Sequence, residues 1–93
     1  MIFTVLLYIR EGMEIEFLEY ENKVLPILSE YEGMLLKRIR HGFSTDMPYE
    51  THIISFKNND QFQRYIDAPE RKQYMHLAEE VIKHIDVFSG TEI

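Results

Sequence analysis

The sequence predicts an α+β fold, a two-layer sandwich with its elements in the order βαββαβ. Three observations lead to this prediction. Four segments have the short apolar runs of strands, two have apolar residues at helical spacing, and along the chain they follow one another in the order βαββαβ. Short connections and right-handed crossovers then place both helices on one face of a four-stranded antiparallel sheet, with strand order 4-1-3-2.

Length and composition predict a single domain over residues 1–93. The chain is 45% hydrophobic, and its 93 residues suffice for one core only. Ten basic against sixteen acidic residues give a net charge of -6, which would repel a phosphate backbone, so no nucleic-acid partner is expected. The absence of cysteine leads us to expect a reducing compartment, the cytoplasm.

The apolar run at the start of the chain is expected to be a strand. It is short, reaches Arg10 at once and has no basic lead, so we expect neither a signal peptide nor a membrane partner. Within residues 2–10 the odd positions are wholly apolar and the even positions mix apolar with polar side chains. A strand that is apolar on both faces belongs in the middle of a sheet.

Residues 13–31 predict an amphipathic helix, because apolar residues recur there at steps of three and four. Acidic residues, Glu21 among them, lie between the apolar ones and predict an acidic outer face. Pro26 removes one backbone hydrogen bond and predicts a kink over residues 22–25 within a single helix. Gly33 is expected to end it.

Residues 34–40 and 49–56 predict a β-hairpin around a turn rich in Gly, Ser, Asp and Pro. A register that faces opposite charges and stacks apolar on apolar residues is favoured. Its facing pairs are Arg40–Glu50, Arg38–His52, Leu36–Ile54 and Met34–Phe56.

The remaining segments predict a broken helix and a last strand. Asn58 is expected to cap a helix, with Gln61 completing a capping box. Pro69 favours the first position of a new helix, so the helix should break at residues 67–68. The second piece has apolar residues at helical spacing up to Ile82, and residues 84–89 predict the last strand.

Together these elements form the ferredoxin-like arrangement, in which the helices leave one sheet face bare. The apolar residues expected on the bare face are Ile2, Leu6, Tyr8, Leu35, Ile39 and Ile53. Such a patch exceeds what monomers usually expose, and the simplest cover is the same face of a second copy. We therefore predict a homodimer.

Two segments carry a resemblance to a known superfamily. They are YENKVLPILSEYEGMLLKR (20–38), with its late proline and its glycine before a strand, and ISFKNNDQFQRYIDAPERKQY (54–74), with its capped and broken helix. Together they cover under half of the chain and resemble the dimeric α/β-barrel superfamily, within it the antibiotic-biosynthesis-monooxygenase-like members or a related small uncharacterised family. The resemblance implies two subunits packed sheet against sheet, and it allows cofactor-independent oxygenation of an aromatic or polyketide-like molecule.

Arg38 and His52 are the predicted catalytic residues. In the register above they lie on the helix-facing side with Arg40 and Glu50, where polar groups on an apolar face suggest the mouth of a pocket. Arg38 could hold an anionic or carbonyl oxygen, and His52 could act as acid or base near neutral pH. The alternative is a solvated strand end with an ordinary Arg–Glu ion pair.

His76 gives a second hypothesis through the same resemblance. It follows Tyr65 by nearly the spacing at which haem-degrading members place a tryptophan and the histidine that binds iron. Tyr65 stands where tryptophan is expected, and Val5 stands where those enzymes carry asparagine. The alternative is a solvent-facing histidine.

The predicted ligand-binding residues are Phe56, Tyr65, Tyr74 and His76. Aromatic side chains suit an apolar cavity, although tyrosines also serve as ordinary core or interface residues. No metal-binding spacing, phosphate loop or dinucleotide motif occurs, so no metal and no cofactor are predicted.

The sequence thus leads to a small homodimeric protein that binds a small, largely apolar or aromatic ligand between sheet and helices. Whether it is an enzyme stays open, and a monooxygenase-like activity is the reading that the resemblance allows. Two alternatives remain: a non-catalytic stress or regulatory dimerisation module, and a protein that binds or degrades haem.

Overall fold

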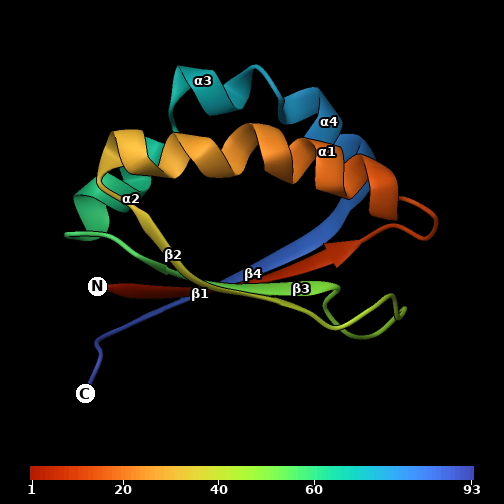
Figure 1. Ribbon diagram of the computed structural model, residues 1–93, viewed down its shortest axis with the longest axis horizontal. Helices are drawn as coiled ribbons and strands as arrows, with labels where there is room; N and C mark the ends of the chain where they lie inside the picture. Colours follow the sequence, from red (N-terminus) through yellow and green to blue (C-terminus); the bar gives the residue numbers. More distant parts are fainter.

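The computed structural model describes residues 1–93 and has the predicted layers, with all helices on one face of an antiparallel sheet (Figure 1). The strands are β1 (Ile2–Ile9), β2 (Met34–Arg40), β3 (Glu50–Ser55) and β4 (Ile82–Gly90). Their order, β2-β3-β1-β4, is the predicted order read from the opposite edge. The chain therefore has the ferredoxin-like fold. None of its helices has the length and apolar character that a membrane crossing requires.

The first helical segment consists of two elements, where one kinked helix was predicted. Helix α1 (Glu14–Val24) continues directly as a 3-10 helix, η1 (Leu25–Tyr31), which has Pro26 in its first turn. Proline removes one α-helical hydrogen bond, and the chain tightens there instead of bending. The segment ends at Glu32, which adopts the left-handed conformation with φ 60°, so Gly33 does not supply the stop.

The second helical segment breaks where it was predicted to break. Helix α2 (Asn59–Ile66) is capped by Asn58, whose Oδ1 accepts the backbone N–H of Gln61 at 2.9 Å. The chain then restarts at α3 (Pro69–Lys72) and again at α4 (Met75–Val81).

The last strand is longer than predicted, because β4 already begins at Ile82. This residue was assigned to the preceding helix, but it pairs with Ile9 at the end of β1. Its side chain is buried, which explains why it also fitted the apolar stripe of a helix.

The hairpin register is correct near the turn and wrong at the other end. Arg40 faces Glu50 and Arg38 faces His52, as predicted. A β-bulge between Leu35 and Lys37 then shifts the register, so the remaining pairs are Leu35–Ile54 and Met34–Ser55. Leu35 consequently packs beneath the helices, and Leu36 is exposed on the other face.

The core fills the space between the two layers and has two parts. One contains Leu7, Ile9, Phe17, Tyr20, Val24, Tyr49, Val81 and Ile82. The other contains Phe3, Ile27, Leu28, Ile54, Phe56 and Tyr65. The odd positions of β1 thus face the helices, as their apolar character predicted.

The opposite sheet face has no helix over it (Figure 1). We call it the uncovered face. Its apolar residues, which follow from the strand register, are Ile2, Leu6, Tyr8, Met34, Leu36, Ile39, Ile53 and Phe88. A depression of about 410 Å³ lies there beside Ile53, Leu36 and Phe88.

Candidate functional site

A cavity of about 90 Å³ lies between the helices and the sheet, where the sequence predicted a ligand pocket. Four of the five helical elements, all except α4, contribute to it, together with β1, β3 and β4. Twelve of its fifteen lining residues are hydrophobic. The other three, Glu21 from α1, His52 from β3 and Arg71 from α3, can form ionic or hydrogen-bonded contacts with a molecule inside it.

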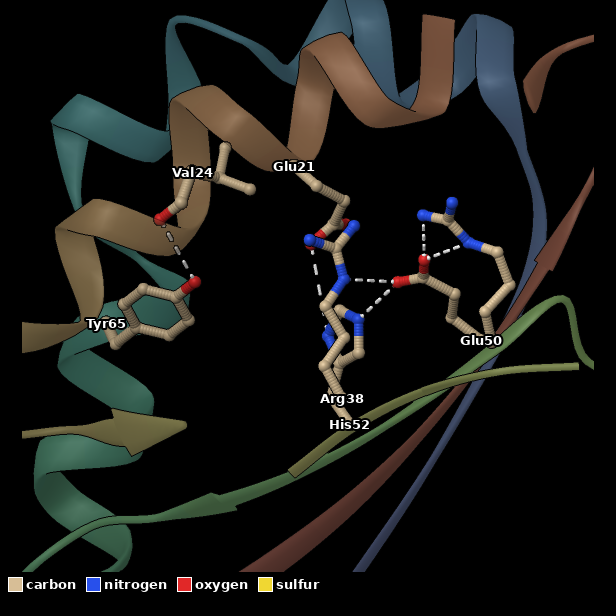
Figure 2. Close-up of polar contacts among 7 residues, drawn as sticks. Glu21, Val24, Arg38, Glu50, His52 and Tyr65 are labelled. Carbon is tan, nitrogen blue, oxygen red and sulfur yellow. Dashed lines mark hydrogen bonds and ion pairs between the residues drawn. The ribbon is translucent and has the colours of Figure 1, made fainter. Parts of the chain in front are cut away.

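Glu50 anchors the polar side of this region. Its carboxylate is fully buried and accepts hydrogen bonds from Arg38 Nε at 2.7 Å, Arg40 Nε at 2.8 Å and His52 Nε2 at 2.8 Å (Figure 2). Arg40 Nη2 makes a further close contact with the same carboxylate. Burial alone would raise the pKa of Glu50, but these donors hold the pKa below its ordinary value. Glu50 is therefore an ionised, fully paired carboxylate.

The carboxylate of Glu50 fixes the orientation and tautomer of His52. An ionised carboxylate can only accept, so His52 Nε2 carries the hydrogen and the neutral ring presents Nδ1 as an acceptor. Burial lowers the pKa of His52, and the hydrogen bond to Glu50 opposes this effect only in part. At neutral pH, His52 is a neutral imidazole with its proton-accepting nitrogen directed towards Glu21.

Glu21 lies beside this nitrogen and has no hydrogen-bond partner for Oε2. Its side chain descends from α1 towards the sheet and is 2% exposed, and Oε2 lies 3.9 Å from His52 Nδ1 (Figure 2). That distance is too long for a hydrogen bond. Burial raises the pKa of Glu21 to about 7, with the charge of Arg38 acting in the opposite direction. The cavity thus contains a carboxyl group that gains and loses a proton near neutral pH.

Arg71 brings the only guanidinium group to the cavity wall. Its Nη1 donates to the backbone oxygen of Ile66 at 3.2 Å, and its guanidinium lies 4.5 Å from the centre of the Tyr65 ring. Its Nε is buried and has no acceptor. The short helix α3, which carries Arg71, is also tied to η1 by Tyr31, whose hydroxyl donates to Glu70 at 2.6 Å.

The structure brings some of the predicted site residues together and separates others. His52 and Tyr65 line the cavity, and Arg38 stands behind it, bonded to Glu50. Phe56 is buried in the core beside the cavity, without lining it. Tyr74 packs against both parts of the core, and His76 is exposed on α4, away from the cavity.

The haem hypothesis gains no support from this arrangement, because His76 does not point into an apolar pocket. His76 is exposed on α4, which agrees with the alternative stated for it, a solvent-facing histidine. No group of three or more His, Asp or Glu side chains is arranged to hold a metal ion.

Sequence reasoning missed two of the three polar residues in the cavity wall, Glu21 and Arg71. Glu21 was assigned to the solvated face of α1, which is wrong. It follows Phe17 by four positions and precedes Val24 by three, so the apolar stripe passes through it, and this spacing was the available signal. Arg71 carries no such signal, since α3 is a single turn whose direction depends on the breaks around it.

The size of the cavity restricts what it can hold. About 90 Å³ is well below the roughly 300 Å³ at which pockets for drug-sized ligands begin. It is also smaller than the engineered cavity of about 150 Å³ that binds benzene. An aliphatic molecule of a few carbon atoms matches this volume, whereas a benzene-sized ring exceeds it.

Comparison with solved structures identifies the same fold in several bacterial proteins. A NIPSNAP-family protein of unknown function from Agrobacterium tumefaciens superposes with a TM-score of 0.74 at 13% identity, over 94% of this chain and 82% of that one. An uncharacterised NIPSNAP-domain protein from Burkholderia xenovorans gives a TM-score of 0.75 at 14% identity, over 97% and 93%. A DABB-family protein with a ferredoxin-like fold from Mesorhizobium loti gives 0.69 at 14%, over 99% and 95%.

These similarities concern the fold, because all the identities are low. No protein-family model and no curated protein sequence matches the chain. The class defined so far is a ferredoxin-like α+β protein with a small cavity between its layers and a buried carboxyl group beside an imidazole in the cavity wall.

Proposed function

We propose that this protein binds a small, largely apolar molecule in the cavity between the helices and the sheet, and that Glu21 and His52 exchange a proton with it. The observation that carries the proposal is the unpartnered oxygen of Glu21, buried in an apolar wall and 3.9 Å from His52 Nδ1. A buried polar atom without a protein partner is costly, and a ligand that supplies the missing hydrogen bond recovers that cost.

The residues have distinct roles in this proposal. His52 Nδ1 accepts a proton, and Glu50 holds the imidazole in place as the carboxylate of a hydrolase triad holds its histidine. Glu21 accepts or returns a proton because its pKa of about 7 lies close to a neutral solution pH. Arg38 and Arg40 keep Glu50 ionised, so their contribution is to position His52.

Cofactor-independent oxygenation, which the resemblance implies, is the enzymatic form of this proposal. In such a reaction a CH2 group of the substrate and one O2 become a C=O group and one water, so the substrate itself supplies both hydrogens and all four electrons. Proton removal is the step that His52 and Glu21 support. Dissolved-oxygen measurements with small aliphatic enols test this form, and His52→Phe should abolish any uptake that wild type shows.

We also propose that two copies pack through the uncovered face and work as a homodimer in the cytoplasm. The support is the run of apolar side chains across all four strands, including Leu36 at 45%, Ile39 at 43% and Phe88 at 59% exposure. A face of this size on a small protein is characteristic of an interface. A dimerisation module without catalysis remains the second candidate, because this face alone supports it.

The binding proposal is tested by titrating the 15N-labelled protein with isobutyl alcohol and following amide shifts. The cavity residues, among them Val24, His52 and Tyr65, should shift together. Val87 lies at the cavity wall on edge strand β4 and is half exposed, so Val87→Phe should block the cavity without overfilling the core and weaken binding about tenfold. Met47→Phe, in the exposed hairpin loop, is the matched control. Shifts that are absent, or equal in both variants, would exclude this site.

A further inference from the structure

The two unpartnered polar groups of the cavity differ in the hydrogen bonds that they can make with a ligand. Arg71 Nε is a permanent donor, buried and without an acceptor. Glu21 Oε2 is equally buried and without a partner, and it can donate or accept according to its protonation. Both belong to the wall of one small cavity. A ligand that satisfies both must offer an acceptor to Arg71 and a second oxygen to Glu21.

We propose that the ligand is a short-chain aliphatic carboxylate, with Arg71 Nε donating to one of its oxygens and the protonated carboxyl group of Glu21 donating to the other. This inference rests on the proposed function and narrows its ligand to a chemical class. Hydrocarbon walls around two polar groups match a molecule with one carboxylate and a short apolar tail.

Charge balance favours this class over a neutral alcohol. A carboxylate beside Arg71 forms a charge-assisted pair inside a low-dielectric cavity, where such bonds are strong. The same negative charge disfavours ionisation of Glu21, so Glu21 takes up a proton when the ligand binds. With Glu21 neutral, one anion and one guanidinium remain at the cavity, and no buried charge stays unpaired.

The surroundings of Glu21 allow this proton uptake. The titratable and charged groups that influence it are Arg38 from β2, Glu50 and His52 from β3, Arg71 from α3, Tyr65 from α2 and its own neighbour Tyr20. Arg38 and Arg40 are bonded to Glu50. Arg38 Nη2 is also buried without an acceptor, but Arg71 is the cation that lines the cavity and can contact an incoming anion there. His52 is held neutral by its burial and adds no charge.

The walls also set the length of the tail. Leu7, Val24 and Ile54 close the cavity from three elements, and Ile85 and Val87 border it at edge strand β4. At about 90 Å³ the space accepts a branched chain of a few carbons. Isobutyrate is therefore the test ligand, and isobutyramide, which has the same shape without the charge, is its matched control.

Calorimetric titration of the full chain with isobutyrate in two buffers of different ionisation heat measures affinity and proton uptake together. We expect one proton taken up per ligand above pH 7, and an affinity that falls about tenfold per pH unit there, because the ionised form of Glu21 must first be neutralised. Isobutyramide should bind more weakly, without proton uptake and without this pH dependence.

Three variants sharpen the test. Glu21→Gln keeps a neutral donor at the same place, so isobutyrate should still bind and the pH dependence should vanish. Arg71→Met should weaken isobutyrate at least tenfold and leave isobutyramide unchanged. Lys72→Met removes the same charge from the exposed neighbour and should have no effect. In wild type, the NMR signal of Arg71 Nε–H should shift on addition of isobutyrate, a measurement that does not depend on the folding of any variant.

The experiments distinguish a failure of the proposed ligand class from a failure of the proposed function. Equal binding of isobutyrate and isobutyramide, both unaffected by Arg71→Met, would overturn the carboxylate class and leave the apolar ligand site standing. Binding of neither compound, together with unchanged cavity signals for isobutyl alcohol, would overturn the proposed function itself.

Discussion

Glu21 is the acidic residue of α1 whose environment differs most from water. Its pKa of about 7, against an ordinary 4.5, means that the folded state binds its proton more tightly than the unfolded state does. The stability that Glu21 contributes is therefore fully present below pH 4.5 and is lost as the pH rises towards 7. The difference corresponds to about 3 kcal/mol.

Glu21→Gln should remove this pH dependence. We expect urea unfolding to show that wild type loses stability relative to the variant between pH 5 and 8, by up to about 3 kcal/mol, so that the variant is the more stable protein at pH 8. Glu19→Gln, exposed on the same helix, should follow wild type. The lowered pKa of His52 reduces stability at the acid end of this pH range. This effect is the same in wild type, Glu21→Gln and Glu19→Gln, so it cancels when their curves are compared. Parallel curves for wild type and Glu21→Gln would contradict the burial of the charge.

Residue types in the sequence allowed the ionic pairs to be predicted, but they did not allow the cavity residues to be predicted equally well. Opposite charges on facing strands are readable once a register is chosen, and Arg38 and Glu50 were placed correctly for this reason. Glu21 was misplaced because a carboxylate normally avoids the core, so its type outweighed its position in the helical stripe. The exception coincides with the candidate site, where local rules are often broken for function.

Among the elements, the start of β2 depends on a close approach that only glycine permits. A Cβ on Gly33 would lie 2.7 Å from the Phe56 ring and 3.1 Å from Leu28. The φ of Gly33 is not positive, so the requirement is one of space. Gly33 lets the chain pass from η1 into the sheet directly over the second part of the core.

Gly33→Ala should therefore destabilise the fold by about 1–3 kcal/mol through overpacking against Phe56. Thermal and urea unfolding measure this loss. Gly90→Ala is the matched control, since a Cβ at Gly90 meets nothing within 4 Å, and it should leave stability within about 0.5 kcal/mol of wild type. If the two variants proved equally stable, the contact with Phe56 would be too loose to matter.

The element order and the helix break could be predicted because each has a chemical marker, such as Asn58 at the cap and proline at the restart. The β-bulge has none. Leu35 and Leu36 are identical side chains, so hydrophobicity cannot tell which of them faces the helices, and the extra residue exchanges their faces. Tertiary packing alone decides this point.

At the scale of the whole molecule, the two faces of the sheet serve different purposes. The helix side holds the core, the cavity and the ionic network. The other side has polar groups at one end, where His84 and Asp86 pair at 2.7 Å, and apolar side chains at the other. This asymmetry, together with the exposed area, is the basis for expecting a second copy there.

Phe88→Lys should convert the proposed dimer to a monomer. Phe88 is 59% exposed on β4, so the subunit fold does not depend on it. In a two-fold interface the substitution occurs twice, each losing about 2 kcal/mol of burial, which raises the dissociation constant about a thousandfold. Ile15→Lys, at an apolar position of α1 that is 71% exposed, should leave the dimer intact. Sedimentation velocity at micromolar concentration decides the matter: a monomeric wild type, or a Phe88→Lys protein that still sediments as a dimer, would show that the sheet face is not the interface.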